Sequence, residues 1–188
     1  MNLTELASFS DKVISAFIQD WQRTPYCWLQ EIDIQSELAH RFHESLPEAR
    51  RCIRAIHDHE PGKPNWFRRV TCEPYVKLPV KSWMHPDIVI WSDQESGSSK
   101  SISSGAYPID LICEIKYSFD TIVSGAGEDL KRLQTSLESD SQPKLAIQLL
   151  FIQKPVVSGD TVRKTPFADG RLIVYQIQLL SDWGANAA

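Results

Sequence analysis

Three charged residues lie in two apolar stretches that are typical of buried strands. Asp87 is near the start of HPDIVIW at residues 85–91, and Glu114 and Lys116 lie in DLICEIKY at residues 110–117. Side chains alternate between the two faces of a strand, so Glu114 and Lys116 share one face, about 7 Å apart along the strand. If the two strands are neighbours, Asp87 and Glu114 can converge at one point.

Two carboxylates that converge away from water repel each other, and a divalent cation removes that repulsion. Mg²⁺ is commonly held by one or two carboxylates together with water and substrate phosphate. Such an ion activates water and polarises a phosphoryl oxygen, and a nearby lysine can orient the water or stabilise the developing charge. These residue types therefore favour hydrolysis of a phosphodiester, with Mg²⁺ or Mn²⁺ as the cofactor.

The residues Pro86-Asp87 followed by Glu114-Ile115-Lys116 resemble the motif of the PD-(D/E)XK nuclease superfamily. That motif places Pro-Asp on one strand and an acidic residue, any residue and lysine on the next. The resemblance implies that Asp87 and Glu114 hold Mg²⁺ with help from the backbone carbonyl of Ile115. It also implies that Lys116 is catalytic and that a glutamate on an earlier helix completes the site.

Two glutamates of one predicted helix could fill this last position. With Ile34 placed at 0° and about 100° per residue, Leu38 and Phe42 fall at about 40° and 80° and form an apolar stripe. Glu31 falls at about 60°, inside the stripe, and Glu37 at about −60°, on its flank. An acidic residue within a core-facing stripe needs a partner, so we expect Glu31 to complete the site, with Glu37 as the alternative.

The spacing of apolar residues predicts the elements that must position these side chains. It predicts helices over residues 4–21, 31–46, 47–59 and 125–139, strands over residues 68–80, 85–91, 107–117, 144–154 and 171–180, and a loop over residues 158–170. This order predicts a mixed α/β fold with a central sheet flanked by helices. The resemblance, which spans about residues 31 to 152, implies a restriction-endonuclease-like αβββαβ core with an extra N-terminal helix and a C-terminal strand.

Length and composition bound the organisation of the chain. With 188 residues and 42% hydrophobic residues, we expect one domain with a substantial core. In this interpretation residues 1–24 form a helical extension packed on a nuclease domain of residues 25–183, with a mobile loop at 92–106 and a frayed tail at 184–188. The N-terminus lacks the features of a signal peptide, and no long apolar window is present, so we expect a cytoplasmic protein without a membrane span.

The net charge of −4 argues against a protein that coats nucleic acid through bulk charge, but it allows a local basic rim. Candidate rim residues are Arg68, Arg69, Lys77, Lys81, Lys131 and Arg132. Ordinary surface solvation explains these residues equally well.

The sequence therefore favours a Mg²⁺-dependent nuclease, with a DNA endonuclease as the first expectation. A catalytically inactive nuclease-fold module that binds a protein or nucleic-acid partner is one alternative. A subunit that is active only within a larger defence, repair or mobile-element complex is another. Cutting both strands of a duplex often needs two active sites, so a homodimer is compatible with this interpretation. The sequence leaves open DNA or RNA, single or double strand, and internal or terminal cleavage.

Overall fold

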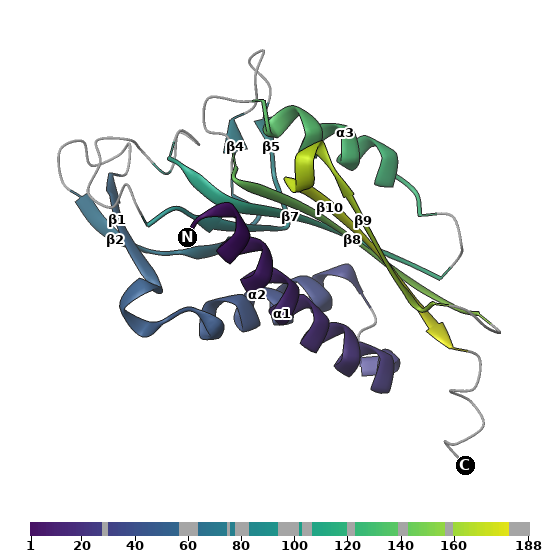
Figure 1. Ribbon diagram of the computed structural model, residues 1–188. Helices are drawn as coiled ribbons and strands as arrows, with labels where there is room; N and C mark the ends of the chain where they lie inside the picture. The colour runs from purple at the N-terminus through teal and green to yellow at the C-terminus, as the bar shows by residue number, and fades with distance from the viewer. Residues whose placement is uncertain are drawn as a thin grey trace.

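The chain forms a mixed α/β fold, as predicted, in which helices flank a six-stranded sheet (Figure 1). The computed structural model describes residues 1–27, 30–56, 64–74, 76–77, 83–93, 102, 107–119, 123–138, 143–156 and 160–180. The helices are α1 (Leu3–Arg23), α2 (Glu31–Ser45) and α3 (Ala126–Ser136), with short 3-10 helices at Pro25–Cys27, Glu48–Arg50 and Ala168–Gly170.

The central sheet has the strand order β3-β6-β7-β8-β10-β9. Its members are β3 (Val70–Cys72), β6 (Ile88–Trp91), β7 (Ile109–Ser118), β8 (Leu145–Val156), β9 (Val162–Phe167) and β10 (Leu172–Leu180). Strands β3, β6 and β7 pair antiparallel, whereas β7, β8 and β10 pair parallel and β9 closes the edge antiparallel to β10. The order of α2, three antiparallel strands, α3 and a parallel strand matches the predicted order of core elements.

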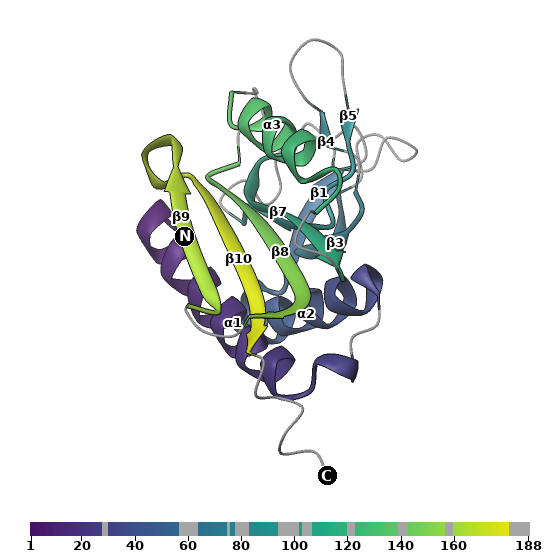
Figure 2. The ribbon, with the colours of Figure 1, turned by 90° about the vertical axis from the view of Figure 1, so that its right-hand side faces the viewer.

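Different elements cover the two faces of this sheet (Figure 2). Helices α1 and α2 pack on one face, in a core that includes Ile88 and Cys113. The other face carries α3 and two small sheets, one of β1 (Cys52–Ile56) with β2 (Pro64–Arg68) and one of β4 (Val76–Lys77) with β5 (Trp83–Met84). The layers follow from the alternation of side chains along each strand, because Val89 and Ile112 point into this second core.

Helices α1 and α2 form where their apolar residues recur at helical spacing. Asn2 caps α1 through a reciprocal pair of hydrogen bonds with Glu5, and both are 2.9 Å long. In α2 the predicted stripe of Ile34, Leu38 and Phe42 is fully buried. Among the described helices, none is long and apolar enough to cross a membrane.

The prediction of a helix over residues 47–59 is wrong in the part that the structure describes, residues 47–56. Only a single 3-10 turn forms at Glu48–Arg50, and β1 follows directly. Within β1 the burial alternates, because Ile53 and Ala55 are buried whereas Cys52 and Arg54 are exposed. This period of two, supported by antiparallel pairing with β2, outweighs the helical propensity of the segment.

Two further boundaries differ from the sequence prediction. The expected loop at residues 158–170 contains strand β9, whose side chains remain largely exposed because it forms the sheet edge. The expected strand over residues 68–80 is divided between the end of β2, β3 and β4.

The remaining predicted elements are confirmed. The structure has β6, β7, β8 and β10 where strands are predicted at 85–91, 107–117, 144–154 and 171–180, and α3 where a helix is predicted at 125–139. Most of the loop predicted at 92–106 and the whole tail at 184–188 lie outside the described residues.

Candidate active site

Pairing of β6 with β7 brings the two predicted carboxylates together. Ile88 lies opposite Cys113 in this antiparallel pair, so Asp87 and Glu114 are at opposing positions at the end of β6. Each points to the face that carries α3, as the alternation of their strands requires. The backbone N–H of Ile115 donates a hydrogen bond of 2.5 Å to Oδ2 of Asp87. The condition that the two strands must be neighbours is therefore met.

A buried glutamine of α2 supports the backbone of Asp87. Nε2 of Gln35 donates a hydrogen bond of 2.8 Å to the carbonyl oxygen of Asp87, and the N–H of Glu73 donates to the same oxygen at 3.3 Å. Gln35 was not among the predicted site residues. Its only sequence signal is its position one turn after Glu31, next to the apolar stripe.

Burial and the charges of neighbouring carboxylates raise the pKa values of both carboxyl groups. Burial is the largest cause for Glu114, followed by the charges of Asp87 and Asp129, and together they raise its pKa to about 9. Burial also dominates at Asp87 and raises its pKa to about 6, although the hydrogen bond from Ile115 opposes the shift. A side-chain hydrogen bond between the two groups raises the pKa of Glu114 and lowers that of Asp87. The folded chain therefore resists ionising this pair fully without a cation.

Lys116 lies between carboxylates of two helices. Its Nζ is 3.2 Å from Oε1 of Glu31, the first residue of α2, and 3.4 Å from Oδ2 of Asp129, in the first turn of α3. Burial alone would lower the pKa of Lys116, but Glu31 and Asp129 raise it above its ordinary value. The ammonium group is therefore protonated at neutral pH and acts as a hydrogen-bond donor and a positive charge.

The two candidate glutamates of α2 have different surroundings. Glu31 contacts Lys116 and raises the pKa of Asp87 through its charge. Glu37 instead forms an ion pair of 2.7 Å with Arg41, which also binds Asp20 at 2.8 Å. Of the two, Glu31 is the one that contacts the predicted site.

Sequence reasoning missed Asp129 and Gln148. Gln148 lies beside Glu114 in the register of β7 with β8 and donates a hydrogen bond of 2.7 Å to the carbonyl oxygen of Ala126. A signal for Asp129 existed: with Leu133 at 0°, it falls at about −40°, close to the apolar stripe of α3. Like Glu37 in α2, however, it lies on the flank of the stripe and not within it, so the argument that selected Glu31 would not have singled out Asp129.

The donor set fits a hard divalent cation. Four carboxylates, those of Asp87, Glu114, Glu31 and Asp129, lie around the half-buried Lys116, and Arg132 pairs with Asp129 at the edge of the group. In the described part of the chain no group of three or more His, Cys, Asp or Glu side chains is arranged so that it could hold a metal ion. Asp87 and Glu114 would therefore hold Mg²⁺ or Mn²⁺ with a backbone carbonyl and with water or substrate oxygens, which is typical of Mg²⁺.

The prediction that Arg69 belongs to a nucleic-acid rim is wrong. Its side chain is 0% exposed and forms ion pairs with Asp93 and Asp110. The reason is that Arg69 lies between β2 and β3, where its side chain turns into the interior and Nε donates to the carbonyl oxygen of Trp91 at 2.8 Å.

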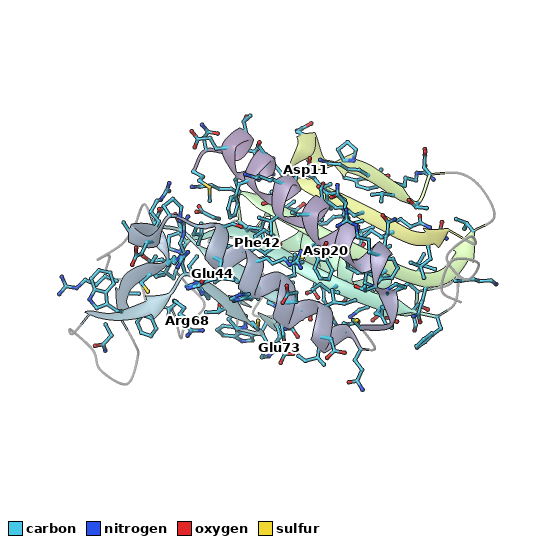
Figure 3. All side chains as sticks on the ribbon, turned by 90° about the horizontal axis from the view of Figure 1, so that it is seen from below. Asp11, Asp20, Phe42, Glu44, Arg68 and Glu73 are labelled. Atoms are coloured by element: carbon cyan, nitrogen blue, oxygen red, sulfur yellow. The ribbon has the colours of Figure 1, made fainter. Side chains whose placement is uncertain are left out.

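The other predicted rim residues lie in three places. Arg68 is exposed on β2, in the same strand as Trp66, and Figure 3 shows it near Glu44 at the C-terminal end of α2. Lys116 contacts the opposite, N-terminal end of that helix, about 20 Å away by the rise of a helix of this length. The exposed Lys131 and Arg132 lie on α3, and Arg132 pairs with Asp129. For Lys77 only the backbone is described, in β4, and Lys81 lies outside the described residues.

No protein-family model matches the chain, and no characterised protein or solved structure matches it significantly. The argument for function therefore depends on the geometry of the site.

Proposed function

We propose that this protein is a Mg²⁺-dependent nuclease that hydrolyses phosphodiester bonds of nucleic acid, with DNA as the expected substrate. The proposal is supported by the residue pattern of a PD-(D/E)XK-like site and by the order of α2, β3, β6, β7, α3 and β8. The observation that carries it is the excess of negative charge around Asp87 and Glu114, which the protein itself does not neutralise.

In this proposal Asp87 and Glu114 hold the cation, together with the carbonyl oxygen of Ile115, and Glu31 completes the site. When bound, the cation neutralises the two carboxylates, lowers the pKa of a water molecule and polarises the phosphoryl group. The hydrogen bond from Ile115 and the support from Gln35 orient Asp87 before any ligand arrives. Such pre-orientation reduces the reorganisation that catalysis requires.

Lys116 supplies the positive charge of the site in this mechanism. Because its ammonium group is protonated, it donates hydrogen bonds to the attacking water or to a non-bridging phosphate oxygen. Water attacks phosphorus, a new P–O bond forms, and the bond to the leaving sugar oxygen breaks. The proton of the water goes to solvent, and the leaving oxygen takes a proton from solvent.

Cleavage assays test the proposal directly. The purified protein is incubated with supercoiled DNA, linear DNA and RNA in 5–10 mM Mg²⁺ or in EDTA, on the order of the concentrations such sites need. We expect cleavage only with the divalent ion, a loss of at least about 100-fold in Asp87→Asn and Lys116→Ala, and unchanged activity in Lys12→Ala, which alters an exposed lysine of α1. Cleavage that persists in both of these variants would contradict the proposal.

An assembly-dependent enzyme is the second candidate. Ile32 and Phe119 are exposed apolar residues that follow Glu31 and Lys116 closely in the chain. Exposed apolar side chains next to a site are typical of interfaces. A rise in specific activity with protein concentration, together with a dimer mass in solution, would favour this candidate over a monomeric nuclease. Binding of nucleic acid without turnover at all concentrations would instead favour a non-catalytic module.

A further inference from the structure

The first turn of α3 forms a wall of the candidate active site. Asp129 belongs to this turn, and its side chain is only 9% exposed. Its Oδ2 lies 3.4 Å from Nζ of Lys116, and its Oδ1 lies 3.5 Å from Nη1 of Arg132. One buried carboxylate thus joins a cation inside the site to a cation at its edge.

Two backbone features tie this turn to the strands that carry the site. Gly125 precedes α3 with φ of +77°, a conformation that favours glycine, and its missing Cβ would lie 4.0 Å from Cε of Lys116. Nε2 of Gln148 donates to the carbonyl oxygen of Ala126, and Gln148 neighbours Glu114 across β7 and β8. The start of α3, three residues before Asp129, is therefore anchored to β8 through Gln148.

Lys116 needs such support because its side chain has four rotatable bonds and an unrestrained ammonium group samples many positions. Glu31 and Asp129 hold the ammonium group from two helices, α2 and α3, that lie on opposite sides of the sheet (Figure 1). Arg132 has a side chain that is 57% exposed, so its guanidinium group remains accessible to a phosphate. Arginine binds phosphate well because its donors match the spacing of the oxygens.

We propose that Asp129 is a positioning residue that aligns Lys116 with the phosphoryl group to be cleaved and Arg132 with a neighbouring phosphate of the same strand. The inference rests on the proposed nuclease function and assigns separate roles to the two cations. Lys116 acts in the chemical step, whereas Arg132 binds the substrate backbone. Asp129 acts indirectly, because it holds both of these cations in position.

Steady-state kinetics of variants separate these roles. We expect Asp129→Asn to lower kcat about 10- to 100-fold, since small misplacements of a catalytic group have effects of this size, while the protein remains folded by circular dichroism. Arg132→Ala should raise KM several-fold, leave kcat nearly unchanged and reduce the salt dependence of binding by about one phosphate contact. Asp129→Glu keeps the charge and should retain more activity than Asp129→Asn.

Glu128→Gln is the matched control, because Glu128 lies in the same turn but is exposed. It should leave kcat and KM unchanged. If the wild type cleaves nucleic acid and Asp129→Asn keeps its full kcat, or if Glu128→Gln loses as much, the positioning role is wrong and the proposed function stands. If Asp129→Glu is no more active than Asp129→Asn, the role of the charge is also wrong. If the wild type does not cleave, both the proposed function and this inference fail.

Discussion

Two clusters of buried charge lie on the same face of β7, one near each end of the strand. Arg69 is at the centre of the first cluster, where it pairs with Asp93 and Asp110, and Arg50 and Lys144 pair with the same two carboxylates. The second cluster is the candidate active site around Glu114, four residues further along β7 than Asp110, or about 13 Å.

The two clusters differ in charge balance. The first contains three cations for two carboxylates, so every buried carboxylate has a cation from the protein. The second contains four carboxylates but two cations, the half-buried Lys116 and the more exposed Arg132. A balanced buried cluster is complete when the chain folds, whereas the second cluster keeps an excess of negative charge that its own cations do not offset.

The pKa values follow this difference. At Asp93 burial alone would raise the pKa, but the hydrogen bond from Arg50 and the charge of Arg69 lower it below the ordinary value. At Asp87 and Glu114 burial and repulsion raise the pKa to about 6 and about 9. Buried charge alone thus does not mark a functional site, and an uncompensated excess of one sign is the better indicator.

The largest effect on stability is expected from Arg69→Met. This change leaves Asp93 and Asp110 without their buried central cation, and loss of one partner of a buried ion pair costs about 3–5 kcal/mol. Urea unfolding measures the loss. Arg68→Ala, at the exposed neighbouring position, should change the free energy of unfolding by less than about 0.5 kcal/mol. Equal effects at the two positions would contradict the structural role of the first cluster.

The next largest effect is a gain in stability for Glu114→Gln without a divalent ion. The folded-state pKa of Glu114 lies above its ordinary value of 4.5. The stabilisation that comes from keeping this carboxyl group protonated is therefore complete below about pH 4.5 and is lost as the pH rises through about 9. In EDTA at pH 8 the variant should therefore be more stable than the wild type, and at pH 4.5 the two should be similar.

Thermal melts at both pH values check this expectation. A wild type whose stability does not fall between pH 5 and pH 9 relative to Glu114→Gln would show that the carboxyl pair is not strained, and the contrast between the two clusters would be lost.

A smaller effect is expected from the divalent ion itself. At tenfold excess over its dissociation constant, Mg²⁺ or Mn²⁺ should stabilise the wild type by about 1.4 kcal/mol at pH 8, which corresponds to a rise in Tm of about 3–5 °C for a chain of this size. The rise should disappear in Asp87→Asn and persist in Arg68→Ala. An equal rise in Asp87→Asn would place the ion elsewhere.

The smallest effect is expected at Glu37. Its ion pair with Arg41 is partly exposed, so Glu37→Gln should cost about 0.5 kcal/mol or less and leave kcat unchanged. Glu31→Gln makes the same change at the glutamate whose carboxylate contacts Lys116. This variant should have a lower kcat. An equal loss of activity in the two variants would contradict the assignment of Glu31, and not Glu37, to the site.

Much of the candidate site could be predicted because its signals are local. Asp87, Glu114 and Lys116 stand out as charges within apolar strands, and Glu31 stands out within an apolar helical stripe. Residues 47–59 were misassigned for the opposite reason. Their helical pattern is local, but the strand that forms there depends on pairing with β2.

The chain itself determines that charged side chains must be buried, because alternation along β7 places Asp110, Glu114 and Lys116 on one face of a core strand. Only the tertiary structure decides which of these charges are balanced. Arg69 reaches Asp110 from a segment 41 residues away, and Asp129 reaches Lys116 from a helix on the other side of a turn. Charge balance depends on such long-range contacts, and it distinguishes the balanced cluster around Arg69 from the cluster around Glu114, where negative charge is in excess.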